Sequence, residues 1–227
     1  MPNTTAAVVK PPAGVCIKLR PQAVRQVCFT APDKVNVITD TAYFGKTFGV
    51  TVLYGSTSKQ ALPADAVKYK TNALYLEAPR SLQKKGIHIQ AVICDGRRGL
   101  TGLFPGIPVQ LCRFHQVKTI NRHLTRNPKT AAAQELRKIT LPLKTCSRAA
   151  FTALLKDRHK QHKNFLNEHT VNTETGKPRY THGQLRSAYN SLKNNLPYLF
   201  AFEYHPDFNL PKTTNLPEGK FGGLKTN

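Results

Sequence analysis

Two apolar, β-branched segments that each end in an aspartate constrain the fold of this chain most strongly. Residues 35–40 read Val-Asn-Val-Ile-Thr-Asp, and a second apolar segment runs from Ile87 to Asp95. Segments of this kind form buried strands, and functional groups in an open α/β sheet collect at the ends of its strands. We therefore expect Asp40 and Asp95 to lie at the same edge of one sheet. The alternative is that each aspartate only begins a turn, as Asp-Thr and Asp-Gly pairs often do.

The segments around these two strands indicate an α/β front half and a helical back half. Further strands are expected at 48–54, 66–69 and 107–112, with a helix at 72–85 that Gly86 ends and a short helix at 97–103. Strand, helix and strand with short connections predict a partly parallel sheet covered by helices. Beyond Arg113 the periodicity is helical almost to Tyr204, with a polar break at 170–178 and smaller breaks at Pro142 and Pro197.

Charge indicates a polyanionic partner. The 227 residues include 34 Lys and Arg against 12 Asp and Glu, a formal net charge of +22. Such an excess favours nucleic acid, because cationic contacts to phosphate release condensed counterions. A ribosomal or other basic structural protein would show the same balance. The hydrophobic fraction of 40% is enough for a folded core.

Composition also bears on location. No stretch approaches the length of a membrane span, and the proline-containing first 32 residues show neither an acidic residue nor the apolar run of a signal peptide. Residues 1–34 are expected to form an extended arm. The five cysteines are scattered without a C-x-x-C pair, which favours reduced thiols in a cytoplasmic, nucleoid-associated protein.

The placement of the few acids predicts a metal-dependent site. Two carboxylates at one sheet edge, surrounded by cations, suit a hard divalent ion such as Mg²⁺ and a substrate phosphate. Glu218 is the third candidate, because Asn215 and Pro217 are typical of a helix start that would place it in the first turn. The alternative for Glu218 is simply a favourable interaction with the helix dipole.

Cys112-Arg-Phe-His115 matches half of a zinc site, but no convincing second half lies nearby. The favoured interpretation is that Cys112 packs at a strand end and His115 begins the next helix, facing the acids. Four basic residues are candidates for nucleic-acid contact, although such runs are also typical of solvated helix faces: Arg97, Arg98, Lys118 and Arg122.

Four segments taken in order resemble the motifs of a known family. They are Asp40-Thr-Ala-Tyr-Phe-Gly45, Cys94-Asp-Gly96, Cys112-Arg-Phe-His-Gln116 and Asn215-Leu-Pro-Glu-Gly219. Together they resemble bacterial insertion-sequence transposases of the DDE class, in the group with a C-x-x-H after the second aspartate that is related to mutator-type transposases. The resemblance runs from about Val35 to the last residue and includes His182-Gly-Gln-Leu-Arg-Ser-Ala-Tyr189.

This resemblance implies a ribonuclease H-like mixed sheet with a large, mostly α-helical insertion. The core would begin at 35–120, the insertion would occupy 121–212, and 213–227 would start the last core helix. It also implies that Asp40, Asp95 and Glu218 hold two Mg²⁺ or Mn²⁺ ions for phosphodiester cleavage and strand transfer. Cys112 and His115 would lie near this site. The implied partners are the DNA of the element ends and target, with a homodimer on paired ends.

Departures from the family pattern leave other functions open. The chain shows neither a zinc-ribbon nor a helix-turn-helix region before Val35, and Pro217 stands where the family usually has an aliphatic residue. We expect a chain truncated at both ends relative to the family. The alternatives are a non-catalytic DNA-binding remnant of a transposase and a metal-dependent nuclease on the same fold.

Overall fold

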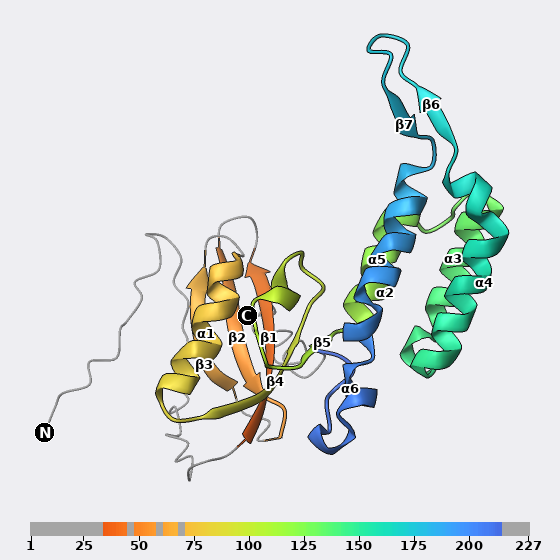
Figure 1. The fold of residues 1–227 in the computed structure, drawn as a ribbon. Coiled ribbons are helices and arrows are strands. Elements are labelled where there is room, and N and C mark those ends of the chain that lie inside the picture. The colour runs from red at the N-terminus through yellow and green to blue at the C-terminus, as the bar shows by residue number, and fades with distance from the viewer. Residues whose placement is uncertain (1–33, 45–47, 58–60, 68–70, 215–227) are drawn as a thin grey trace, which may run out of the picture.

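The structure is a computed structural model that describes residues 34–44, 48–57, 61–67 and 71–214. Figure 1 shows two parts: a twisted sheet with a helix across it, and an elongated group of helices that extends away from the sheet beyond β5. The described residues of the chain are therefore an α/β protein with a large helical segment.

Five strands form one mixed sheet in the order β3-β2-β1-β4-β5. The first three form an antiparallel meander: β1 (Lys34–Phe44), β2 (Phe48–Gly55) and β3 (Ala61–Val67). The other two, β4 (His88–Cys94) and β5 (Val109–Leu111), join on the far side of β1, and both run parallel to it. The sheet thus changes from antiparallel to parallel at its central strand.

The two faces of the sheet are covered differently. Helix α1 (Asn72–Lys84) lies across one face (Figure 1), where Tyr75 and Leu82 share a core with Val37 and Leu53. The opposite face carries Asn36 and Ala91. Residues 201–210, near the end of the described chain, cover that face. Ala91 packs on Ala201 and Leu210, and the side chain of Asn36 donates to the carbonyl of Phe208.

The helical segment follows β5 directly. Its helices are α2 (Arg113–Leu124), α3 (Ala131–Thr140), α4 (Arg148–Leu166), α5 (Gly183–Leu199) and α6 (Ala201–Tyr204). Three short 3₁₀ turns also occur: η1 (Leu100–Gly102), η2 (Leu141–Lys144) and η3 (Pro206–Phe208). Between α4 and α5 a hairpin of β6 (His169–Val171) and β7 (Pro178–Tyr180) projects beyond the helix ends (Figure 1).

Polar contacts as well as apolar ones join α2 to α5. Ile120 and Leu124 of α2 are buried in the core that also holds Leu185 and Leu192 of α5. Beside them, the Gln116 side chain donates to Ser191 Oγ at 3.0 Å and accepts from Asn195 Nδ2 at 2.8 Å. These bonds fix the rotation of α2 about its axis, so they also fix the direction of the residues at its start.

Several sequence predictions are confirmed. Helix α1 matches the predicted 72–85 almost residue for residue, and Gly86 follows it with a φ of +81°, as a C-terminal glycine should. The strands predicted at 48–54, 87–95 and 107–112 are present as β2, β4 and β5.

Other predictions are wrong in extent. The segment at 97–103 forms only the turn η1, because Gly99 has a φ of +86° and interrupts a helix. Pro197 lies inside the last turn of α5 instead of breaking it. In contrast, the polar break predicted at 170–178 is confirmed, since α4 ends at Leu166, α5 begins at Gly183, and the stretch between them belongs to the β6–β7 hairpin. Residues 1–33 of the expected arm lie outside the described residues.

No helix in the described part of the chain has both the length and the apolar character needed to cross a membrane.

Candidate active site

Asp40 lies inside β1, so the prediction that it ends a strand is wrong. The strand continues to Phe44 because Thr41 to Phe44 pair with Phe48 to Thr51 of β2 as an antiparallel hairpin. The Asp40 side chain is nevertheless at the end of the parallel pairing, which stops at Ile38 opposite Ile93 of β4. Asp40 is buried, with 6% of its surface exposed, and its Oδ1 accepts the Thr41 amide at 2.8 Å.

Asp95 directly follows β4 and is half-buried. Its Oδ1 accepts the Arg97 amide at 3.3 Å, which bends the chain away from the strand. The loop is then attached to the start of α1, because Arg97 Nε donates to Asn72 Oδ1 at 2.9 Å and Asn72 Nδ2 donates to the Arg98 carbonyl at 3.3 Å. The turn predicted from the Asp-Gly pair is therefore present, and Asp95 also lies at the edge of the sheet.

The two aspartates lie on the same face of the sheet and at the same level. Ile38 and Ile93 are paired across β1 and β4 and share a small cluster with Tyr54. Each aspartate stands two residues beyond its isoleucine, and side chains two apart point to the same face of a sheet. Asp40 and Asp95 are thus neighbours across two parallel strands, on the face opposite α1.

Cys112 and His115 flank this pair of acids from the start of α2. The Cys112 amide donates to the Cys94 carbonyl at 2.8 Å, so β5 ends beside the end of β4. Thr214 then connects the two residues of the motif. Its amide donates to Cys112 Sγ at 3.3 Å, and its hydroxyl lies 3.5 Å from the same sulfur and 3.3 Å from His115 Nδ1.

The charges in this cluster act on one another. A hydrogen bond with Cys112 raises the pKa of His115, burial opposes the rise, and the negative charges of Cys112, Asp40 and Asp95 add to it, so the pKa of His115 lies above its ordinary value. Both carboxylates thus act electrostatically on His115. The prediction that it faces the acids is consistent with this arrangement.

Cys112 shows the complementary effect. Burial raises the pKa of its thiol, but hydrogen bonds from His115 and Thr214, the His115 amide and the His115 charge together outweigh burial, so the pKa lies below its ordinary value. The sulfur is thus engaged by protein donors on the interior side of His115, and the carboxylates form the polar surface of the site.

The predicted basic residues divide into two pairs. Arg97 and Arg98 are exposed in the loop after Asp95, and Arg97 is held in place by Asn72. Lys118 and Arg122 are exposed on α2, where Lys118 Nζ lies 4.3 Å from the Phe114 ring centroid and Arg122 donates to Thr119 Oγ1 at 3.5 Å. The first pair lies next to the acids, whereas the second extends along α2 away from them.

Glu218, the third predicted acid, lies outside the described residues. Within those residues no group of three or more His, Cys, Asp or Glu side chains is placed to hold a metal ion. Asp40 and Asp95 themselves offer hard carboxylate oxygens, the ligands that Mg²⁺ and Mn²⁺ prefer. Asp40 and Asp95 are therefore chemically suited to bind a divalent cation of the kind that the resemblance implies.

The chain matches no protein-family model and no curated protein sequence.

Sequence reasoning missed three residues that position the site. Thr214 joins Cys112 to His115, and Asn72 holds the loop after Asp95. Arg113 is fully buried beneath the start of α2, where it donates to the carbonyls of Leu199, Lys144 and Cys146. Thr214 and Asn72 follow from long-range packing that no local pattern encodes. Arg113 had one available signal, its place directly after a buried strand.

Proposed function

We propose that this chain is the catalytic part of a DDE-type DNA transposase, which cleaves phosphodiester bonds and transfers strands with divalent metal ions. The observation that carries the proposal is the placement of Asp40 and Asp95, side by side on one face of two parallel strands and both acting on His115. Burying carboxylates lowers stability unless a cation compensates their charge. A buried and a half-buried carboxylate side by side in a protein of net charge +22 are therefore better explained by binding a cation and an anionic substrate than by a role in stability.

The topology of the sheet supports a ribonuclease H-like core. An antiparallel meander of β1 to β3 is followed by α1 and two parallel strands, giving the order β3-β2-β1-β4-β5. The helical segment after β5 stands where the resemblance expects an insertion. The described chain then returns to the site at Thr214, four residues before Glu218.

The side chains around the acids have distinct roles in this proposal. Asp40 and Asp95 hold the metal ions, with Glu218 as the third carboxylate. When bound, the two ions activate water or a DNA 3′-hydroxyl and stabilise the leaving oxygen. Arg97, with its guanidinium fixed by Asn72, and Arg98 contact the phosphates next to the cleaved bond. His115 completes the polar wall on the α2 side. The protein acts on DNA ends as a homodimer.

Nicking of supercoiled plasmid tests the proposal. The wild-type chain is incubated with Mg²⁺ or Mn²⁺, in parallel with Asp40→Asn, Asp95→Asn and the control Asp157→Asn. Asp157 is an exposed residue of α4 that accepts one hydrogen bond from Gln161. We expect the wild type and the control to nick, and the two site variants to lose at least about 10³-fold in rate, since metal-bound charge stabilisation supplies most of such a reaction.

The outcomes separate the three candidate functions. Nicking that continues in Asp40→Asn or Asp95→Asn contradicts the assignment of these residues. Cleavage of the plasmid without any joining of the 3′-hydroxyl of an added oligonucleotide to plasmid DNA favours a nuclease over a transposase. A folded wild type that binds DNA but never nicks favours the non-catalytic DNA-binding remnant.

A further inference from the structure

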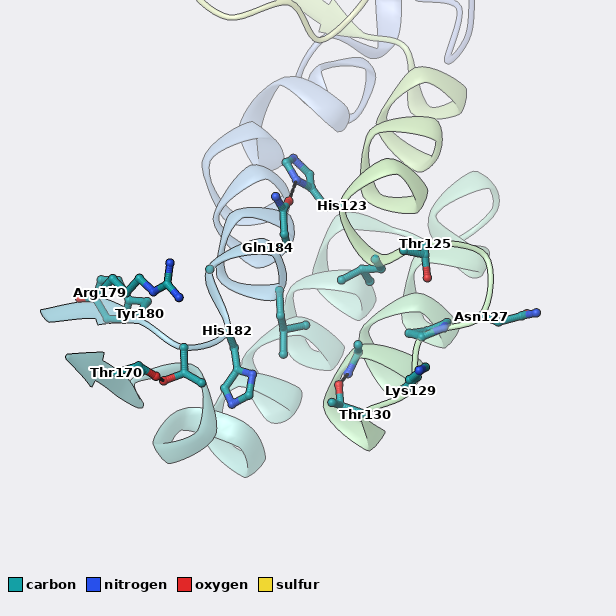
Figure 2. Close-up of a pocket in the computed structure, with 16 residues that line it drawn as sticks. His123, Thr125, Asn127, Lys129, Thr130, Thr170, Arg179, Tyr180, His182 and Gln184 are labelled. Carbon is teal, nitrogen blue, oxygen red and sulfur yellow. Dashed lines mark hydrogen bonds between the residues drawn. The ribbon is translucent and has the colours of Figure 1, made fainter. Parts of the chain in front are cut away.

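An open cleft lies at the other end of α2 from His115. It has a volume of about 760 Å³ and is formed by the α2–α3 connection, the start of α5 and the β6–β7 hairpin. Figure 2 shows Asn127, Lys129 and Thr130 on one side and Thr170, Arg179 and Tyr180 on the other. His123 Nδ1 and Gln184 Oε1, 2.8 Å apart, close one end of the cleft between α2 and α5. We call this the distal cleft.

The distal cleft is cationic. Lys129 and Arg179 are exposed and lie on its opposite walls, and neither forms an ion pair with any residue that the structure describes. None of the residues that line the cleft is an aspartate or a glutamate. The acid that reaches its edge, Glu168, is bonded to His182 at 2.8 Å, so its charge is directed to that imidazole. Two exposed cations on opposite walls of one open cleft, with no ion pair among the described residues, favour an anionic occupant.

Lys118 and Arg122 lie on the exposed face of α2, between its start beside the acids and its end, where His123 and Leu124 line the distal cleft. At 3.6 residues per turn, His115, Lys118 and Arg122 fall on one side of the helix, opposite the buried Gln116, Ile120 and Leu124. Helix α2 has 12 residues, so about 18 Å separate its ends. The cationic groups therefore form a track along one helix face and not an isolated pocket.

We propose that the distal cleft binds the phosphate backbone of duplex DNA about five base pairs from the position held at Asp40 and Asp95. The spacing follows from the ~18 Å length of α2 and the 3.4 Å rise per base pair of a DNA strand. An extended polyanion satisfies both the cleft and the track, whereas a single small anion would leave Lys118 and Arg122 unused. The position of the cleaved bond in this inference rests on the proposed function.

The test compares Lys129→Ala/Arg179→Ala with the control Lys84→Ala/Lys85→Ala, which removes two exposed cations from the end of α1. Fluorescence anisotropy measures the Kd of a duplex of about 30 base pairs over a series of NaCl concentrations. Loss of two phosphate contacts should lower the slope of log Kd against log salt by about 1.8 and weaken binding about tenfold, while the control stays within about twofold of wild type. The thermal unfolding midpoint should be unchanged, because Lys129 and Arg179 make no side-chain bond that the variant removes.

Three results decide the proposal. A slope and a Kd equal to those of the control overturn it. So does a variant that binds duplex normally but has lost binding of inorganic phosphate, because the cleft would then hold a small anion. If the double variant binds duplex more weakly than the control, the distal cleft is supported as a DNA site. If the wild type also fails to bind Mn²⁺ at Asp40 and Asp95, that second result contradicts the proposed catalytic function but not the DNA site.

Discussion

At the residue scale, Arg113 is the basic residue whose role differs most from that of its neighbours. It is fully buried, and its guanidinium donates to the carbonyls of Leu199, Lys144 and Cys146 while lying 4.3 Å from the Phe200 ring centroid. These contacts join the start of α2, the end of η2 and the end of α5. In a chain with so many exposed cations, this one has a structural function.

Arg113→Met should therefore be strongly destabilising. Methionine keeps much of the packing but removes the side-chain donor to the carbonyls of Lys144 and Cys146 and one of two donors to the Leu199 carbonyl, which Gln110 also binds. Each lost bond to a charged group contributes about 1.5–3 kcal/mol. We expect the free energy of unfolding, measured by urea titration, to fall by about 3 kcal/mol or more. The exposed Arg122→Met should change it by less than about 0.5 kcal/mol. Equal effects of the two substitutions would show that Arg113 does not have this role.

His115 gives a second prediction at this scale. Its pKa is raised in the folded chain by Cys112 and by the two aspartates, so protonated His115 stabilises the folded state. This stabilisation is fully present below the pKa of histidine in the unfolded chain. It is lost as the pH rises through the higher, folded pKa. NMR titration without divalent metal should give His115 a pKa above that of histidine in an unfolded chain, and Asp40→Asn should lower the pKa of His115. A His115 pKa that is the same in wild type and Asp40→Asn would contradict this electrostatic effect.

At the element scale, the loop after β4 determines where Asp95 points. Its conformation depends on Gly99, whose φ is +86° and where an added Cβ would lie 2.8 Å from Asn72 Nδ2. That amide is also the group that holds the Arg98 carbonyl, at 3.3 Å. A side chain at Gly99 thus displaces the residue that fixes both arginines of the loop.

Gly99→Ala should lower the free energy of unfolding by about 1–2 kcal/mol, because a positive φ and a close contact act together. Gly102→Ala is the matched control, since a Cβ there meets nothing within 4 Å. Its effect should stay within about 0.5 kcal/mol. Chemical denaturation measures both variants. Similar stability of the two would mean that the loop accommodates a side chain and does not depend on this glycine.

The elements also show what local sequence could predict. Helix α1 and the strands β2, β4 and β5 follow from short-range periodicity, and Gly86 from its place after a helix. The length of β1 could not be predicted in this way, because Thr41 to Phe44 are held as strand by pairing with β2. The strands of the hairpin between α4 and α5 are three residues long and fully exposed, so they carry little periodic hydrophobic signal.

At the scale of the whole molecule, the sequence predicted that Asp40 and Asp95 share one region of the sheet, but not which residues surround them. Asp40 and Asp95 were recognisable because an acid after an apolar strand is rare in a chain with 12 acidic residues. Thr214 and Asn72 were not recognisable from the sequence, since each forms its hydrogen bond with a residue far away along the chain. The described fold brings all four to one region, from β1, the end of β4, the start of α1 and the segment after η3.

In the proposed function, the net charge of +22 and the cations of the distal cleft would place the DNA along α2. The sheet supplies the chemistry in this account, and the helical segment holds the substrate. Phosphoryl transfer depends mainly on positioning and charge neutralisation, so this separation of roles is chemically sufficient.

Isothermal calorimetry with Mn²⁺ tests the central claim, that Asp40 and Asp95 form one metal-binding pair, most directly, because it requires no DNA. The wild type, Asp40→Asn, Asp95→Asn and the control Asp157→Asn are titrated after each is shown to be folded by circular dichroism. The account predicts binding in the wild type and control, and at least about tenfold weaker binding in both site variants. Binding that is unchanged in either site variant, or absent in the folded wild type, would contradict it.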